Sequence, residues 1–230
     1  LGELNDESLL ALARQRLGVR TLAPALGDLL VQRCAGNPLY CEELTTALRD
    51  GGALEIDGDE AALSTDVSDA SQVPASLHGL ISSRIDRLSA SAQMTLKIAS
   101  VIGRVFAVQL VSSLHPGNPD PRDLADDLRH LVELELIARV PFGTRADLGR
   151  APYYQFKNEL VRDVAYGLML YAQRRALHRS MGAWIEAHLA DEVANHYATL
   201  GRHWALAAEG SEPDLVACQR AATYLERGAD

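Results

Sequence analysis

Long apolar runs are missing from the sequence. No stretch approaches the roughly 20 residues of a membrane-spanning helix, and the first residues lack the basic and apolar regions of a signal peptide. Cysteine is scarce too: Cys34, Cys41 and Cys218 are too few for a disulfide framework and form neither a Cys-x-x-Cys motif nor a Cys/His pair at zinc-ligand spacing. We therefore expect a protein of a reducing, cytoplasmic compartment that neither is secreted nor spans a membrane.

Basic residues are outnumbered by acidic ones. The 22 Lys and Arg residues against 31 Asp and Glu residues give a formal charge of -9. Binding to nucleic-acid phosphates needs clustered Lys and Arg, so this balance argues against a large nucleic-acid interface and leaves room only for a local patch. A hydrophobic content of 47% over 230 residues is enough for one large packed domain or two to three small ones.

Catalytic motifs are also missing. No Gly-Lys pair occurs, so the Gly-x-x-x-x-Gly-Lys-[Ser/Thr] loop of a complete ATPase is absent, and no Gly-x-Ser-x-Gly elbow positions a nucleophile. The aspartates that could suggest a cyclase metal pair fall in a predicted loop and are interpreted as solvated. They are Asp57, Asp59, Asp66 and Asp69. We predict no catalytic residue in this chain.

Histidines and arginines near the C-terminus are the remaining candidates for chemistry. His188, His196 and His203 are close in sequence but lack the i, i+4 spacing of a helical zinc pair, so we predict no metal site. The basic cluster at residues 174–179 could meet phosphate, but Glu186 and Asp191 follow it, which favours a solvated helix face.

Helical periodicity with clear start and stop signals dominates the chain. Asn5 is expected to cap a first helix that Gly18 ends, and a second helix is predicted over residues 23–35. A third helix follows and stops at Gly51-Gly52, after which residues 51–73 read as an exposed loop and the first domain boundary. Later helices are predicted, from a first-turn Pro74 onward, over residues 74–89, 92–102, 108–114, 123–134, 159–171, 174–189, 191–209 and 213–227.

Strand signals are confined to one place. Residues 136–140 and 153–156 flank a polar loop with Gly143, Thr144, Gly149 and Pro152, which predicts a hairpin with a long tip. Three helices followed by a hairpin is the order of a winged-helix domain. The last two predicted helices alternate small and aromatic residues, as helical-repeat hairpins do.

The chain is organised around a junction at residues 34–44, where one helix stops and another starts. Gly36 is suited to end the first helix in a left-handed conformation, Asn37 to cap the second, and Pro38 to occupy its first turn. As a local structure this helix junction is self-sufficient, and it needs no ligand to explain it.

Four motifs in this order resemble the STAND class of signal-transduction ATPases, particularly those linked to class III adenylyl cyclases or LuxR-type regulators. The motifs are Ala35-Gly36-Asn37-Pro38-Leu39-Tyr40 with Glu42-Glu43-Leu44; Val73-Pro74 leading to Ser83-Arg84-Ile85-Asp86-Arg87-Leu88-Ser89; Ala99-Ser100-Val101-Ile102-Gly103-Arg104-Val105-Phe106; and Phe156-Lys157-Asn158-Glu159-Leu160-Val161-Arg162-Asp163-Val164-Ala165-Tyr166, followed by Arg174-Arg175-Ala176-Leu177-His178-Arg179.

The resemblance implies a mainly α chain with three parts. Residues 1–72 resemble the helical lid subdomain, residues 73–190 the winged-helix region with one β-hairpin, and residues 191–230 the first hairpin of tetratricopeptide (TPR)-like repeats. The nucleotide-binding core of the family is missing, so we expect the chain to be a piece of a longer protein.

The resemblance also implies site residues. In the family, the Gly-x-Pro element of the lid lies against the nucleotide base, a role that passes to Gly36, Asn37 and Pro38. A histidine of the winged-helix region often senses the nucleotide phosphates, and its position is taken here by Asn158, which carries no charge. Asn158 is equally suited to a plain cap of the helix that begins at Glu159.

From this resemblance we expect a regulatory, non-catalytic segment of an ATP- or ADP-dependent switch. Its partners would be an upstream nucleotide-binding core and proteins bound by the TPR-like repeats. One alternative is a DNA-binding winged-helix regulator with residues 123–134 in the major groove, although acidic residues dominate that segment. The other is a nucleotide-free interaction scaffold.

Overall fold

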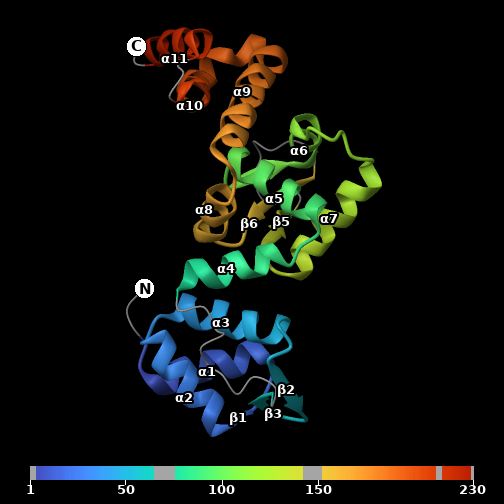
Figure 1. Ribbon diagram of the computed structural model, residues 1–230, viewed down its shortest axis with the longest axis vertical. Helices are drawn as coiled ribbons and strands as arrows, with labels where there is room; N and C mark the ends of the chain where they lie inside the picture. The colour runs from blue at the N-terminus through green and yellow to red at the C-terminus, as the bar shows by residue number, and fades with distance from the viewer. Residues whose placement is uncertain (1–3, 65–75, 142–151, 211–213, 229–230) are drawn as a thin grey trace. The chain divides into compact units, whose positions relative to one another are not determined.

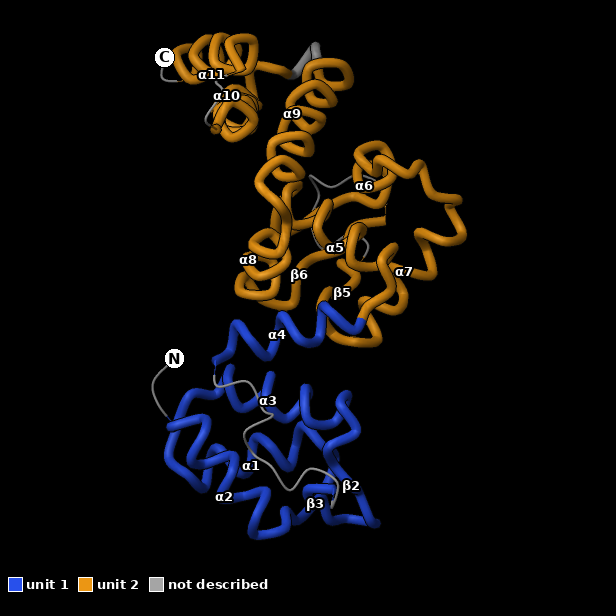
Figure 2. Tube along the Cα trace, viewed as in Figure 1, with its two compact units in different colours: residues 1–87 blue, residues 88–230 orange. Residues whose placement is uncertain are grey.

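The chain is mainly helical, as predicted. The computed structural model describes residues 4–64, 76–141, 152–210 and 214–228, and this part contains eleven α-helices and two three-stranded sheets (Figure 1). Contacts divide the chain into two compact units, Leu1–Arg87 and Leu88–Asp230 (Figure 2). No helix within the described ranges combines the length and apolar character needed to cross a bilayer.

The first unit is built on the three helices that the sequence predicted. These are α1 (Asp6–Leu17), α2 (Pro24–Cys34) and α3 (Pro38–Asp50). Asn5 caps α1 by accepting a hydrogen bond from the Ser8 N–H at 2.8 Å, and Gly18 ends it with a φ of 72°. A fourth helix, α4 (Leu77–Asp86), belongs to this unit and contacts α3. Ser76 caps α4, while Pro74 lies outside the described residues.

The expectation of an exposed loop after α3 is wrong for residues 54–63. Strands β2 (Leu54–Asp57) and β3 (Glu60–Leu63) form an antiparallel hairpin there, and β1 (Thr21–Leu22) pairs with β3 in parallel. Gly58, with a φ of 55°, makes the tight turn between the strands. Asp57 therefore ends a strand and Asp59 lies in the turn, whereas Asp66 and Asp69 lie outside the described residues.

One apolar core holds the first unit together. Helices α1, α2 and α3 bury one face each, β3 adds Ala61, and α4 adds Leu80. Among its largest fully buried side chains are Leu9, Leu26, Leu30, Leu44 and Leu80. Burial of aliphatic side chains of this size stabilises a fold by about 1.5–3 kcal/mol each, so this core fixes the position of the α2–α3 junction.

The second unit begins with alternating short helices and strands. In chain order these are α5 (Ala90–Ile102), β4 (Val105–Ala107), α6 (Val108–Leu114), α7 (Pro121–Glu133), β5 (Ile137–Arg139) and β6 (Tyr153–Phe156). The predicted β5–β6 hairpin is confirmed, with Ile137 opposite Phe156. Strand β4 was not predicted and pairs with the other side of β6, giving the antiparallel order β4-β6-β5. The predicted tip, including Gly143, Thr144 and Gly149, lies outside the described residues.

The rest of the second unit is helical, as predicted. It comprises α8 (Glu159–Gly167), α9 (Tyr171–His188), a 3-10 helix (Ala190–His196), α10 (Tyr197–Ala208) and α11 (Leu215–Arg227). The single helix predicted over residues 191–209 is thus divided at His196. Helices α9, α10 and α11 approach closely where glycines face large side chains, with Gly182 against Trp204 and Gly201 against Leu225.

Candidate functional site

The α2–α3 junction reverses the chain within three residues. Ala35 and Gly36 both have left-handed conformations, with φ values of 44° and 78°. The Ala35 N–H donates to the Val31 carbonyl at 3.2 Å and the Asn37 N–H donates to the Cys34 carbonyl at 2.8 Å. Ala35 is therefore the residue that caps α2, one position before the glycine predicted to do so, and Gly36 continues the reversal.

Asn37 and Pro38 start α3 as the sequence predicted. The Asn37 Oδ1 atom accepts a hydrogen bond from the Tyr40 N–H at 3.1 Å, and Pro38 is the first residue of the helix. On the other side, the Gly36 carbonyl accepts a hydrogen bond from the Leu4 N–H at 2.8 Å. Asn37 is exposed and Pro38 is half-buried, so the junction presents a preformed polar and apolar edge.

Two free thiols lie behind this edge. Cys34 and Cys41 are both buried, and Cys41 Sγ donates to the Leu9 carbonyl at 3.7 Å. A hydrogen bond with Cys41, followed by burial, raises the pKa of Cys34, which therefore stays protonated. The thiols thus act as small core side chains that fix the junction to α1.

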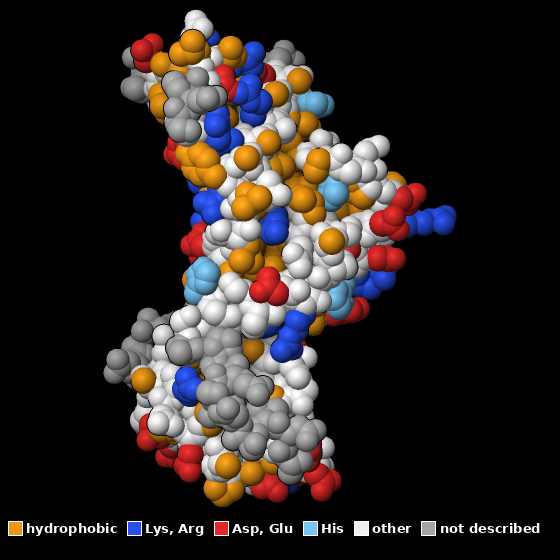
Figure 3. Space-filling model, in the orientation of Figure 1, with side chains coloured by type: hydrophobic (Ala, Val, Ile, Leu, Met, Phe, Trp, Pro, Cys, Tyr) orange, Lys and Arg blue, Asp and Glu red, His pale blue; other side chains and the backbone are white. Residues whose placement is uncertain are grey.

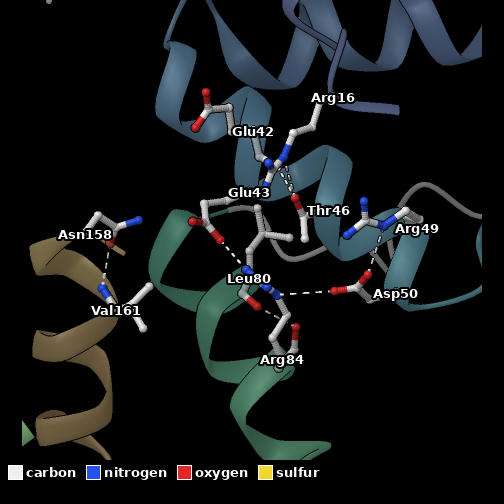
Figure 4. A network of polar contacts seen from close by, with 11 residues as sticks. Arg16, Glu42, Glu43, Thr46, Arg49, Asp50, Leu80, Arg84, Asn158 and Val161 are labelled. Carbon is white, nitrogen blue, oxygen red and sulfur yellow. Dashed lines mark hydrogen bonds and ion pairs between the residues drawn. The ribbon is translucent and has the colours of Figure 1, made fainter. Parts of the chain in front are cut away.

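A buried ion pair joins α3 to α4, and it unites two of the motifs that carry the family resemblance. Arg84 Nη1 lies 2.5 Å from Glu43 Oε2, and Arg84 Nε lies 3.8 Å from Asp50 Oδ2 (Figure 4). Both side chains of the closer pair are less than a tenth exposed. Both residues lie in these motifs, but the sequence alone predicts no role for them. Burial of this pair could have been predicted, because each charged residue lies on an apolar helix face. Arg84, for example, shares a face with Leu80 and Ile81.

A family model described as "Domain of unknown function (DUF8739)" matches residues 5–62. The matched segment begins at the Asn5 cap and ends in β3, so it contains the α2–α3 junction and the small sheet. No curated protein matches the chain.

Asn158 caps α8. Its Oδ1 atom accepts a hydrogen bond from the Val161 N–H at 2.9 Å (Figure 4), and its extended φ and ψ values of -145° and 164° are those of an N-cap. The capping role that the sequence suggested is therefore confirmed. The second role, contact with nucleotide phosphates, stays a prediction.

Each arginine of the basic cluster at residues 174–179 contacts another group of the second unit. Arg174 donates to the Met169 and Gly167 carbonyls at 3.2 and 2.7 Å, next to the end of α8. Arg175 donates to the Ala207 carbonyl of α10 at 3.2 Å, and Arg179 pairs with Asp214, the cap of α11. These arginines tie α9 to its neighbours, which corrects the expectation of a merely solvated face.

The predicted histidine candidates do not converge. His188 bonds the Trp184 carbonyl at 3.0 Å, and His203 is buried against α9. No group of three metal-ligating side chains comes together among the residues that the structure describes. His203 instead meets His178, a residue that sequence reasoning had not singled out. Their Nδ1 atoms lie 2.8 Å apart, and His178 Nε2 lies 2.9 Å from the Tyr166 hydroxyl.

Burial governs the chemistry of this histidine pair. Burial first, then the neighbouring His203 and Arg202, lowers the pKa of His178 to about 3, and burial and Arg202 lower that of His203 to about 4. Both rings are therefore neutral near pH 7. The burial of His178 could have been predicted from helical periodicity, because His178 lies on the same face of the helix as Met181 and Ile185.

Proposed function

We propose that this chain is the regulatory, non-catalytic segment of a STAND-type ATPase, working as a nucleotide-dependent switch. The observation that carries the proposal is the α2–α3 junction, where Gly36, Asn37 and Pro38 form a rigid, accessible edge. A proline ring offers a flat apolar surface to a nucleotide base, and a helix N-terminus favours negative charge. ATP or ADP would be held mainly by an upstream core, with the junction closing over the base.

The order of elements supports the assignment of residues 73–190 to a winged-helix region. Helices α5, α6 and α7 precede the β5–β6 hairpin, and a short strand between the first two helices pairs with that hairpin. The antiparallel α10–α11 pair, in which Gly201 lies directly against Leu225, supports a TPR-like hairpin as a surface for protein partners.

The mechanism would be a shift between two conformational populations. Contacts between nucleotide and Pro38 in one state, and their loss in the other, would supply the free-energy difference that moves the domains. The buried Glu43–Arg84 pair would make α3 and α4 move as one body, so that a contact at the start of α3 is passed on to α4.

The test compares two prolines in the full-length protein. Pro24 and Pro38 each occupy the first turn of a helix, so Pro24→Gly and Pro38→Gly have similar costs for the backbone. We expect Pro38→Gly to raise the dissociation rate of a fluorescent ADP about tenfold, equivalent to roughly 1.4 kcal/mol. Pro24→Gly should leave that rate unchanged. Equal rates in both variants and the parent would remove the nucleotide role.

A second experiment tests whether an upstream nucleotide-binding core exists. The coding region upstream of Leu1 should contain, within about 300 residues or two domains, a Gly-x-x-x-x-Gly-Lys-[Ser/Thr] loop between a strand and a helix. Without that loop, a nucleotide-free interaction scaffold becomes the better proposal.

The DNA-binding alternative is disfavoured by the charges of α7. Asp123 and Asp126 are exposed on this helix, and Arg129 is already paired with Asp126 at 2.8 Å. On the face shown in Figure 3, Lys and Arg side chains are interspersed with Asp and Glu. We expect no salt-dependent binding of duplex DNA at sub-micromolar protein in a fluorescence anisotropy titration. Binding that weakens steeply with salt would reverse this ranking.

A further inference from the structure

A cleft of about 420 Å³ opens in the second unit, where the C-terminal end of α5 meets α8, α9 and α10. Val101, Ala205 and Leu206 give it apolar walls, while Arg162, Tyr166 and Arg202 line its polar side. Its volume lies within the range of small-molecule sites, and mixed walls of this kind are typical of them. No predicted site residue lies in it.

The two arginines of the cleft differ in how their charge is used. Arg162 lies 2.9 Å from Glu159 and 2.9 Å from Asp163, so its charge is compensated. Arg202, which is exposed, has no hydrogen bond or ion pair to any side chain among the described residues. Asp163 also lines the cleft, but it is paired with Arg162, so Arg202 is the guanidinium of the cleft that can pair with a ligand's negative group.

The positive charge of Arg202 acts on the two buried histidines beside the cleft. After burial, the charge of Arg202 contributes to the lowered pKa values of both His178 and His203. Arg174, whose guanidinium lies 4.8 Å from the centre of the Tyr166 ring, adds a second positive charge that lowers the pKa of His178. Burial, with Glu209 acting in the same sense and Arg174 and Arg202 against it, raises the pKa of Tyr166. The end of the cleft formed by Arg202 and the histidine pair is thus electropositive and suits an anion.

We propose that this cleft binds a small organic carboxylate, whose negative group pairs with Arg202 while its apolar part lies against Val101, Ala205 and Leu206. One uncompensated guanidinium matches a single negative charge, and the planar fork of arginine suits a carboxylate in a bidentate geometry. A phosphate ester with two charges would leave one of them unpaired in a partly apolar cleft.

The position of the cleft gives the ligand a structural effect. The lining residues come from α5, α8, α9 and α10, so a bound carboxylate would tie the α10–α11 hairpin to the helices before it. Binding to the folded state alone would raise the stability of the second unit by mass action. This inference does not depend on nucleotide binding at the α2–α3 junction.

Nuclear magnetic resonance of the histidine rings tests the site in the 230-residue chain. The probes are acetate, isovalerate, benzoate and indole-3-acetate, each compared with its neutral amide. At least one acid should shift the His178 and His203 ring signals saturably below about 10 mM, a weak but specific affinity, and its amide should not. A bound negative charge should also raise the pH at which these two rings titrate.

Two arginine variants make the test specific. Arg202→Gln should weaken binding at least tenfold, whereas Arg122→Gln, which changes an exposed arginine of α7 outside the cleft, should leave it unchanged. Arg202 is exposed, so the variant should keep the tryptophan fluorescence spectrum of the folded parent. The proposal is overturned if none of the four acids saturates, if the amides bind equally well, or if Arg202→Gln binds as tightly as the parent.

Discussion

His178 and His203 place two Nδ1 atoms 2.8 Å apart in a buried site, which leaves room for one proton between them. Protonation of both rings would put two protons in this contact and two charges beside Arg202. The folded state therefore takes up protons less readily than the unfolded chain, whose histidines titrate near 6.5. The pair makes the link between α9 and α10 sensitive to acid.

Stability of the second unit should consequently fall with acid. The two folded-state pKa values, about 3 and about 4, lie below 6.5, so the contribution is complete above about pH 6.5 and is lost as pH falls toward 4. Each histidine should remove about 1.4 kcal/mol per pH unit across that window. Urea unfolding followed by tryptophan fluorescence at pH 7 and pH 5 measures the change.

The control separates this pair from general acid effects. His203→Asn retains an acceptor for a hydrogen bond from His178 but removes one titrating ring, so the difference between pH 7 and pH 5 should shrink by about half. His188→Asn, at an exposed position, should leave the difference unchanged. An unaltered pH dependence in His203→Asn would contradict the assignment.

The buried Glu43–Arg84 ion pair should affect the stability of the first unit. Arg84→Met should destabilise the first unit by about 3–5 kcal/mol, because it leaves a buried carboxylate without its guanidinium. The double variant Glu43→Leu/Arg84→Met should recover most of that loss, since it removes both buried charges. Hydrogen exchange of the α3 peptides provides the readout. Additive losses in the double variant would indicate that the two side chains act independently.

Helix α9 meets α10 at Gly182, and this contact determines how close the two helices come. An added Cβ atom would lie 2.8 Å from Trp204 Cε2, and the indole is held by its hydrogen bond to Glu186 at 3.0 Å and by Arg220 stacked over it. The Gly182→Ala substitution should therefore destabilise the second unit by about 1–3 kcal/mol, despite the higher helix propensity of alanine.

Far-UV circular dichroism during urea unfolding measures this cost. The matched control is Gly167→Ala, at the end of α8, where an added Cβ atom would meet nothing within 4 Å. That variant should be neutral or slightly stabilising. If Gly182→Ala matched it, the helices would not need the close approach.

The elements that could be predicted from sequence carry their signals locally. Helix α1 lies between a capping Asn5 and a left-handed Gly18, both of which act on adjacent backbone groups. Strand β4 has three residues and pairs with β6 some fifty residues later, so no local period reveals it. The β2–β3 hairpin was missed because β2 is mostly exposed and shows no alternation, although the turn Gly58-Asp59 is a common two-residue hairpin loop.

The same distinction applies to the candidate sites. The roles of Asn37 and Asn158 as helix caps follow from short-range pattern, and the structure confirms both. The His178–His203 contact and the Arg202 cleft arise from helix packing between distant segments, which composition and spacing do not encode. A histidine on an apolar helix face was the signal available for the His178–His203 contact, whereas Arg202 is exposed and gave no such signal.

At the scale of the whole molecule, the chain forms two compact units, and its aromatic residues are unevenly distributed between them. Both tryptophans, Trp184 and Trp204, lie in the second unit, whereas the first contains Tyr40 as its single aromatic residue of the Phe, Trp and Tyr class. The first unit also has its own core, formed by α1 to α4 and the small sheet. Tryptophan fluorescence therefore reports on the second unit alone.

This distribution predicts that a change in one unit can be seen without a change in the other. Arg84→Met should speed hydrogen exchange in α3 while the tryptophan unfolding midpoint stays at its parent value, and Gly182→Ala should do the reverse. Domains with separate cores commonly unfold as separate cooperative units. A shared shift of both readouts in either variant would mean that the two cores unfold in one transition, and stability effects would then have to be assigned to the chain as a whole.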